Sequence, residues 1–298
     1  MSTIIDLIVS TVTQGLIYAL LAYGIFITYK ILDFPVLTVD GSFPLGAAVT
    51  AVLLVRGCNP YLTLIIAIAA GALAGLITGI IHVRLRVRDL LAGIITMTAL
   101  FSINLQNACS NLASDRSYDP IFTGTPVKAL LVGVPLMYRK LIVSLVLAII
   151  FKIILDLFFN TKCGMLLRAT GNNANVVTAL ARDQGSMKIL GLVIANALVA
   201  LCGAVVCHEQ RSFSSTMGTG QMVFGLATVI IGSTIFRRMS FVKGTTCAVF
   251  GSIIYKACIQ AAISLGLPAN LLKLITAVLF LLILVLGNLK KGKVTRHA

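Results

Sequence analysis

The sequence has few charged residues and a single glutamate, Glu209. Charged residues make up 11% of its 298 positions, whereas soluble proteins carry about 25%. The hydrophobic share is 58% and the mean hydropathy is +1.03. The stretches between the apolar runs are too short to build a solvated catalytic domain. We therefore expect a membrane protein that acts within the bilayer.

Catalytic, metal-binding and nucleic-acid-binding motifs are also missing. The chain has no Ser-His-Asp set, no HExxH or GxSxG motif and no paired carboxylates, which argues against an enzyme. Its seven cysteines form no CxxC pair and no metal-ligand spacing. It has no tryptophan, and few aromatic residues stand among the basic ones, so nucleic-acid bases have no stacking platform. The sequence thus predicts a non-catalytic chain with no metal or cofactor of its own and no nucleic-acid partner.

Apolar runs long enough to cross a bilayer, which takes about 20 residues, recur along the chain. Seven full-length runs lie at 7–29, 61–82, 90–110, 141–159, 187–207, 244–263 and 270–288. Two shorter runs, 42–55 and 221–236, each follow a polar stretch that contains glycine. Counting both gives about nine segments. The fold class is therefore all-α and polytopic, with residues 1–298 forming a single transmembrane domain.

The basic residues test this count, because basic loops favour the cytoplasmic side of a membrane. The formal net charge is +15. With nine segments, the N-terminus outside and the C-terminus inside, every strongly basic loop falls on the inner side. These loops carry Arg84, Arg86, Arg88, Lys162, Arg168, Arg182, Lys188, Arg237, Arg238, Lys243 and the tail lysines. The loop 160–186 then lies inside and the loop 111–140 outside, and leaving out either short segment would reverse some of the basic loops.

Two features of the predicted outer side allow more than one interpretation. Cys58 and Cys109 would both lie there, which makes a disulfide between them conceivable. His208 and Glu209 end the sixth segment. A solvated helix end is the simpler interpretation of this pair, and a docking surface for an external partner is the alternative.

The two short segments resemble one another. Gly41 and Gly46 in the first have the same spacing as Gly220 and Gly225 in the second. The predicted topology runs the two segments in opposite directions, as in an inverted repeat. Short, glycine-interrupted segments at corresponding places in two halves indicate discontinuous helices beside a central path. Two ordinary kinked helices are the alternative.

Polar residues near these segments are candidates for the substrate pathway, because polar groups facing lipid are unfavourable. The candidates are Asp40, Gly41, Ser42, Phe43, Asn104, Asn107, Gly220 and Gln221. We expect Asp40 to cap a half-helix rather than to contact the solute. Asn104 and Asn107 either bond a neighbouring helix or line a wet path, whereas Asn196 is expected to bond between helices.

Ionisable residues inside the spans look nearly absent. A proton- or sodium-driven transporter usually buries such residues as relays. Their scarcity favours energy supplied by a separate subunit.

Gly71, Gly75 and Gly79 recur every four residues in the third segment. They therefore share one helix face, where a second backbone can approach closely. The pattern predicts a tight helix contact, either within the chain or between two copies.

The inner loop 160–186 is the predicted contact for the separate subunit that supplies the energy. Asn173 can cap a short helix that places Val176 and Leu180 on one face and ends at Gly185. An amphipathic helix that projects into the cytoplasm could act as a lever for a soluble motor. A plain interfacial helix is the alternative.

Three stretches together resemble the permease subunits of ABC-type importers in the branched-chain amino-acid and ribose permease superfamily. They are Leu32 to Phe43, Leu166 to Asn172, and Met217 to Gly220 with Gly225 to Ala227. The resemblance covers nearly the whole chain. It is strongest to the subgroup of amino-acid uptake permeases, those for aromatic amino acids included.

The resemblance implies a multi-pass permease of the bacterial plasma membrane that imports a small solute, an amino acid being the expected one. The implied partners are a second permease copy, cytoplasmic ATP-binding subunits that hold the ATP and magnesium, and an extracytoplasmic solute-binding lipoprotein. The implied ATPase-coupling residues are Arg168, Ala169, Thr170, Gly171, Asn172, Asn173, Val176 and Leu180. Cys163 and the Asn172, Asn173 pair depart from the commonest versions. The alternatives are a secondary transporter or channel that needs no ATPase, and a structural scaffold.

Overall fold

The computed structural model describes residues 2–113, 121–122, 133–172, 183–236 and 242–264, with isolated positions at 274, 277, 278, 281 and 285. Within these ranges the regular elements are helices, apart from two three-residue strands. Seven helical stretches are long and apolar enough to cross a membrane, and one shorter apolar helix accompanies them. The predicted class, a polytopic helical membrane protein, is confirmed. The ninth predicted segment, 270–288, lies almost wholly outside the described residues.

The helices follow the predicted apolar runs closely. In chain order the elements are α1 (Ser2–Ile25), η1 (Phe26–Ile31), α2 (Val39–Val55), α3 (Pro60–Val83), α4 (Asp89–Ala108), β1 (Asn111–Ala113), α6 (Leu136–Asn160), α7 (Lys162–Asn172), α9 (Gln184–Gln210), β2 (Ser212–Ser214), η2 (Ser215–Gly218), α10 (Gln221–Ile235) and α11 (Gly244–Ser264). The element η1 is a π-helix that continues α1, and η2 is a short 3₁₀ turn. The largest shifts are at the starts of α1 and α6, which begin at Ser2 rather than at 7 and at Leu136 rather than at 141.

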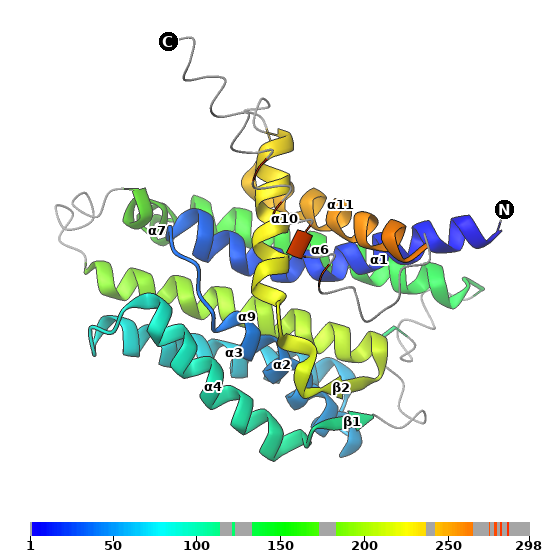
Figure 1. Ribbon diagram of the computed structural model, residues 1–298, viewed down its shortest axis with the longest axis horizontal. Helices are drawn as coiled ribbons and strands as arrows, with labels where there is room; N and C mark the ends of the chain where they lie inside the picture. Colours follow the sequence, from blue (N-terminus) through cyan, green and yellow to red (C-terminus); the bar gives the residue numbers. More distant parts are fainter. Residues whose placement is uncertain are drawn as a thin grey trace, which may run out of the picture.

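The bundle has two distinct ends (Figure 1). The short helix α7 lies at one end, and the antiparallel strands β1 and β2 lie at the other. Helices α3 and α9 run antiparallel between the two ends, so Val83 meets Gly185 near α7 while Thr63 bonds His208 near the strands. The predicted basic loops that the structure describes, at the end of α3 and around α7, gather at the α7 end.

Helices α1 to α3 and α9 to α11 share one arrangement. Helix α3 packs along α9, and α11 packs along α1. Helix α2 also contacts α3, as α10 contacts α11. The third helix of each half is therefore seated on the first helix of the other half, which is the form that an inverted repeat takes in space.

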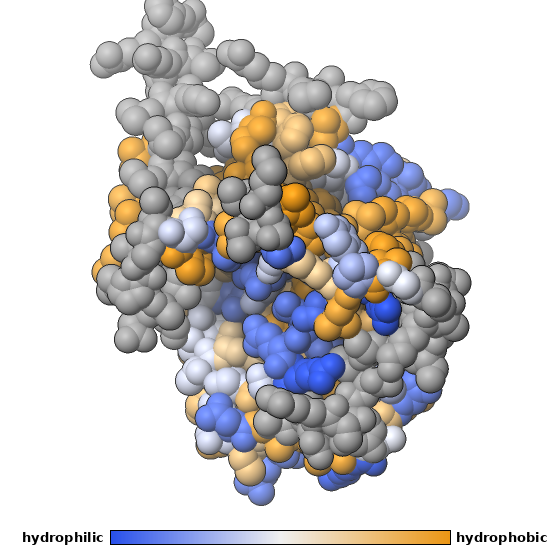
Figure 2. Space-filling view, turned by 90° about the vertical axis from the view of Figure 1, so that its right-hand side faces the viewer, coloured by the Kyte–Doolittle hydropathy of each residue, from blue (hydrophilic) through white to orange (hydrophobic). Residues whose placement is uncertain are grey.

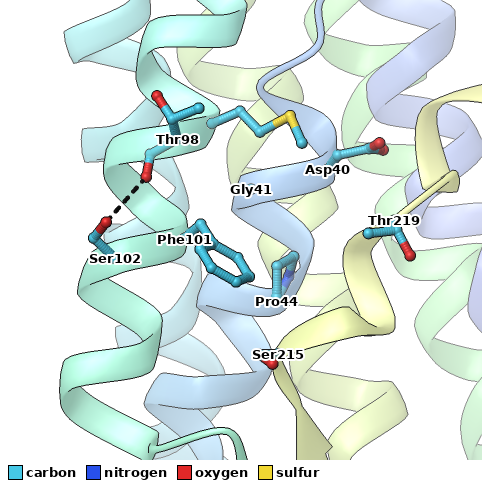
Figure 3. A pocket seen from close by; sticks show the side chains of 9 residues that line it. Asp40, Gly41, Pro44, Thr98, Phe101, Ser102, Ser215 and Thr219 are labelled. Atoms are coloured by element: carbon cyan, nitrogen blue, oxygen red, sulfur yellow. Dashed lines mark hydrogen bonds between the residues drawn. The ribbon is translucent and has the colours of Figure 1, made fainter.

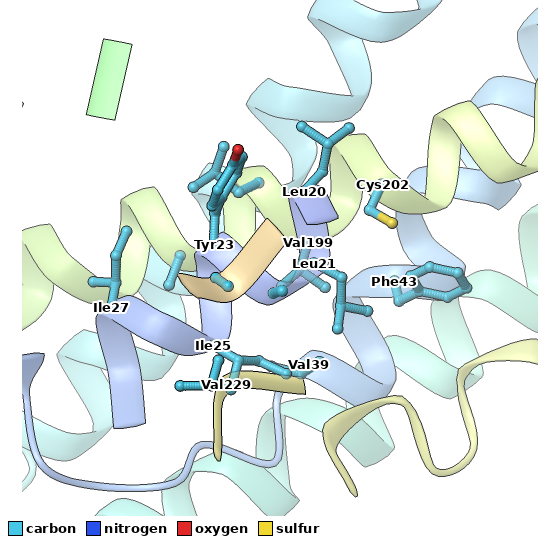
Figure 4. Close-up of a cluster of buried hydrophobic side chains, with 14 of the residues drawn as sticks. Leu20, Leu21, Tyr23, Ile25, Ile27, Val39, Phe43, Val199, Cys202 and Val229 are labelled. Carbon is cyan, nitrogen blue, oxygen red and sulfur yellow. The ribbon is translucent and has the colours of Figure 1, made fainter. Parts of the chain in front are cut away.

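The hydrophobic core lies along α1 and α9 (Figure 4). Leu21, Tyr23, Phe43, Val199 and Cys202 are all completely buried there. The Tyr23 hydroxyl donates a hydrogen bond of 3.1 Å to a backbone carbonyl of α6, so this large ring is buried without leaving its polar end unpaired. The core therefore joins helices from both halves of the chain.

The three spaced glycines of α3 all face α9. A Cβ at Gly75 would lie 2.8 Å from the Val193 Cα, and one at Gly79 would lie 3.1 Å from the Ile189 Cα. A Cβ at Gly71 would meet the Cβ of Ala200. This glycine face is occupied within the chain, so it is not the surface that meets a second copy.

The conceivable disulfide is not formed, because Cys58 and Cys109 are both free thiols. They follow α2 and α4 at the strand end of the bundle. Cys163 stands at the opposite end, exposed on α7.

Replacing Gly75 by leucine should separate α3 from α9. Overpacking of a close contact destabilises a protein by about 2 kcal/mol or more, which corresponds to a fall in melting temperature of roughly 5 °C or more. Unfolding can be followed with a thiol-reactive dye, since Cys202 and Cys207 are buried. Ala69→Leu adds a comparable side chain at an exposed position of the same helix and should leave the melting temperature unchanged. Equal melting curves for Gly75→Leu and wild type would contradict the packing role.

Candidate functional site at the crossing of two short helices

The two short helices meet at their N-terminal ends. Helix α2 begins after a non-helical segment that follows η1, and α10 begins after η2. The carboxylate of Asp40, in the first turn of α2, joins them. Its Oδ1 accepts a hydrogen bond of 2.7 Å from the Met222 amide, and its Oδ2 accepts one of 3.1 Å from the Gly220 amide. Asp40 thus caps the start of α10.

This cap differs from the expected one. Asp40 was expected to precede and cap its own half-helix, but it lies inside α2 and caps a helix that begins 180 residues later. The first amides of α2 already have a partner, because Gly41 and Ser42 both donate to the Thr38 carbonyl. Gly220, at the N-cap of α10, has a φ of 87° and no side chain with which to cap. The acceptor for α10 therefore has to come from another element.

Pro44 also shapes the start of α2. Proline has no amide hydrogen, so the Asp40 carbonyl receives no α-helical hydrogen bond from position 44. That carbonyl faces Gly218 so closely that a Cβ at Gly218 would collide with it. Both the side chain and the carbonyl of Asp40 therefore face the connection between α9 and α10.

A pocket of about 300 Å³ opens beside this crossing (Figure 3). It lies between α2, α4 and the segment around η2. Its lining residues are Asp40, Gly41, Pro44, Met97, Thr98, Phe101, Ser102, Ser215 and Thr219. A lining that combines apolar groups with the side chains of Asp40, Thr98, Ser102, Ser215 and Thr219 suits a small solute that has an apolar body and polar ends.

The structure separates the predicted pathway residues into two groups. Asp40, Gly41 and Gly220 lie at the crossing. Ser42 and Phe43 instead turn into the protein: the Ser42 hydroxyl donates to Asn196 Oδ1 at 2.7 Å, and Phe43 is fully buried. The bond between Ser42 and Asn196 joins α2 to α9, which confirms the expectation that Asn196 bonds between helices.

The remaining predicted pathway residues are Gln221 and two asparagines of α4, and their side chains have different surroundings. Gln221 follows Gly220, and its Nε2 donates to the Met217 carbonyl at 2.9 Å. Asn104 approaches the crossing from α4 and donates from Nδ2 to the Gly41 carbonyl at 3.4 Å, while its buried Oδ1 has no hydrogen-bond partner. Asn107 is exposed and does not reach the crossing.

The predicted coupling stretch is helical where the structure describes it. Residues Arg168, Ala169, Thr170, Gly171 and Asn172 belong to α7, which begins well before the helix expected from Asn173. Asn173, Val176 and Leu180 lie outside the described residues.

Helix α7 packs tightly on its neighbours. Gly171 contacts the Ile31 carbonyl at the end of η1, and Gly164 contacts the Phe158 carbonyl of α6. Leu167 and Thr170 of α7 are both buried. The Arg168 guanidinium lies 4.8 Å from the centre of the Phe159 ring. The opposite face of α7, which includes Lys162 and Met165, is exposed.

The end of the predicted coupling helix needs a correction. Gly185 does not end a helix but lies in the first turn of α9, which Asp183 caps. The Asp183 carboxylate accepts hydrogen bonds from the Ser186 hydroxyl and from the Gly185 and Ser186 amides. These bonds, with that of the Ser186 hydroxyl the largest influence, lower the pKa of Asp183 below its ordinary value. An acidic N-cap at this point begins a new helix instead of closing an old one.

The strand end of the bundle is less solvated than expected. His208 is only 1% exposed, and its Nε2 lies 3.0 Å from the Thr63 hydroxyl, so the interpretation of a solvated helix end is wrong for this residue. Glu209 pairs with Lys140 of α6 at 3.8 Å. Figure 2 looks onto this end and shows hydrophilic residues gathered near its middle.

Sequence reasoning missed several ionisable residues inside the predicted spans, and the structure describes three of them. Lys152 and Asp156 lie in α6, and Lys256 lies in α11. Asp156 accepts a hydrogen bond of 2.7 Å from the Thr245 hydroxyl and pairs with Lys243 at 3.3 Å. The view that the spans hold almost no such residues is therefore wrong. All three could have been found, because they interrupt apolar runs in plain sequence.

A metal site is not evident in the part of the chain that the structure describes. There, no three His, Cys, Asp or Glu side chains gather closely enough to hold a metal ion. Among the described residues the crossing therefore offers hydrogen-bonding groups and apolar contacts rather than a metal centre.

Replacing Asp40 by alanine should open the crossing. Losing a cap with charge-assisted hydrogen bonds costs about 1 to 3 kcal/mol, so the melting temperature of Asp40→Ala should be lower than that of wild type. The melting temperature of Asp40→Asn should lie between the two. Asp89→Ala is the matched control, because Asp89 also lies in a first turn but bonds only the adjacent Leu90 amide at an exposed position. If both alanine variants melted alike, the bridging role of Asp40 would be refuted.

Comparison with known proteins agrees with this architecture. Residues 7–285 match the family described as the permease component of the branched-chain amino acid transport system. The tyrosine transport system permease protein of Clostridioides difficile (strain R20291) is 40% identical over 282 residues, which cover 95% of this chain and 92% of that protein. An uncharacterized protein of Rickettsia prowazekii (strain Madrid E) is 30% identical, covering 93% of this chain and 96% of its own length.

A more distant relative is the ribose import permease protein RbsC of Escherichia coli (strain K12), which is 24% identical over 86% of this chain and 77% of its own. No solved structure matches the chain significantly. The match along nearly the whole chain shows that this protein belongs to the family of branched-chain amino acid transport system permease components.

Proposed function

We propose that this chain is the membrane-spanning subunit of a binding-protein-dependent importer that moves an amino acid into a bacterial cell. The observation that carries the proposal is the crossing of α2 and α10, where two half-helices begin beside a pocket of about 300 Å³. The name of the tyrosine transport relative supports an amino acid as the solute. ATP is hydrolysed by separate subunits, and two copies of the chain form the membrane part.

The crossing suits a transport path because both short helices, α2 and α10, begin at this one place. Transporters that alternate access use such discontinuous helices, whose free ends provide polar groups inside the membrane. Here both free ends are N-terminal, and each carries a partial positive charge. The Asp40 carboxylate offsets the partial positive charge at the start of α10, and Asp40 also lines the pocket.

Helix α7 is the proposed contact for the ATP-binding subunit. Its exposed face is available to a partner, while its buried face rests on the end of η1 through Gly171. Ile31 ends this π-helix, and the non-helical segment after it leads directly to Asp40. π-helical turns are frequent at functional positions. Movement of α7 would therefore displace η1 and, through it, the start of α2.

In this scheme, ATP-driven closure of the partner subunits pushes α7. The pocket then opens alternately to one side of the membrane and to the other. The N-terminus lies outside, and α7 lies on the cytoplasmic side. Such rigid displacements between packed elements are common in transport and switching proteins.

Reconstitution in proteoliposomes tests the function. Uptake of radiolabelled L-tyrosine should require the ATP-binding subunit, ATP and the solute-binding lipoprotein together. Omitting any one of them should reduce uptake to background. Uphill uptake by the purified chain alone, driven by an ion gradient, would instead establish a secondary transporter and exclude the proposal.

Coupling through α7 is tested by the double variant Arg168→Glu, Gly171→Pro. The new side chain at position 171 collides with the Ile31 carbonyl, and the charge reversal removes the Arg168 contact with Phe159. We expect at least a tenfold loss of ATP-driven uptake, which is the effect of about 1.4 kcal/mol or more. Cys163→Ser, an exposed change on the same helix, should keep normal uptake. Wild-type turnover in the double variant would rule out the coupling role.

A further inference from the structure

Lys256 is a positive charge in an unusual place. It lies within α11, one of the helices long and apolar enough to cross the membrane, and is half-buried there. Placing a charged residue in the apolar region costs free energy, and such residues usually serve a function. The crossing described above makes no use of Lys256.

Aromatic rings from two other helices surround the ammonium group. Lys256 Nζ lies 3.6 Å from the centre of the Tyr18 ring in α1 and 5.1 Å from that of Phe224 in α10. The Tyr18 and Phe224 rings are themselves in contact, with centres 4.9 Å apart. Ring faces attract a cation but do not neutralise it.

No carboxylate balances this charge among the described residues. None lies within 4 Å of Lys256 Nζ there, and Glu209, which acts on Lys256 electrostatically, is already paired with Lys140. A half-buried ammonium on aromatic faces, with no carboxylate of the described residues within 4 Å, is suited to receive an anionic group from outside.

The surroundings add a hydrogen-bond acceptor. Gln221 opens α10 next to Tyr18, and its Oε1 is buried without a hydrogen-bond partner. Phe224 is in the same first turn. The group therefore combines a cation, a free acceptor and aromatic rings, all at the beginning of the half-helix that Asp40 caps.

We propose that Lys256, with Tyr18, Phe224 and Gln221, forms a transient binding site for the carboxylate of an amino acid in transit. The ammonium binds the carboxylate, Gln221 Oε1 accepts from the solute's amino group, and the two rings contact its side chain. The same positive charge repels amines that lack a carboxylate, which adds selection inside the membrane. This inference rests on the proposed import of an amino acid and adds the chemical group that the path recognises.

Substitution of Lys256 in the reconstituted complex tests the site. Lys256→Met should lower the maximal rate of L-tyrosine uptake about tenfold or more, the usual effect of losing a hydrogen bond to a charged group. Lys256→Arg, which keeps the charge, should retain more of the rate than Lys256→Met. The matched control is Lys152→Met, which removes another lysine from an apolar helix and should keep the wild-type rate. Equal rates for wild type and Lys256→Met, or equal losses in Lys256→Met and Lys256→Arg, would overturn the site.

A measurement on the wild-type complex does not depend on the folding of any variant. Binding of radiolabelled L-tyrosine to the permease and ATP-binding subunits, without the lipoprotein, is challenged with two competitors. The compound 3-(4-hydroxyphenyl)propionate keeps the carboxylate and should compete, whereas tyramine keeps only the amine and should compete at least tenfold more weakly. Equal competition by both, or no tyrosine binding up to its solubility limit, would contradict the carboxylate site.

The two proposals fail in distinguishable ways. If the complete wild-type complex takes up no amino acid, the proposed function is wrong. If it takes up tyrosine while Lys256→Met does so at the same rate, only the carboxylate site is wrong.

Discussion

The bond between the Asp40 carboxylate and the first amides of α10 is the contact on which the centre of this protein depends. Lipid offers no hydrogen-bond partner, so a helix that begins within the membrane must find one in the protein. Gly220 supplies the sharp backbone turn but no acceptor, and Asp40 supplies the acceptor from the other half of the chain. Helix α10 therefore has no complete start without α2.

The rest of the bundle holds this junction in place through close backbone contacts. Ser42 ties α2 to α9 through Asn196, and the glycines of α3 bring that helix against α9. At the far end, Gly171 rests on η1, whose continuation leads to Asp40. Contacts of this kind leave little free space, so displacement of one element requires its neighbours to move too.

Hydropathy and charge predicted most of the fold, because the bilayer imposes a length on each apolar run and a side on each basic loop. The short apolar runs and their glycines also located the two discontinuous segments. The cap on α10 was beyond such reasoning, since it joins residues 180 positions apart and no local pattern records it. The burial of His208 was missed for a similar reason: its partner, Thr63, comes from a distant helix. Lys256 was a different kind of miss, because it stands visibly within an apolar run.

The placement of the free thiols has a practical consequence. Cys109 is exposed at the strand end, and Cys163 is exposed at the opposite end, on α7. In a sealed vesicle, a membrane-impermeant maleimide added to one side would reach only one of the two. Identifying which of these two cysteines is labelled would therefore give the orientation of the chain in the membrane, without introducing any tag.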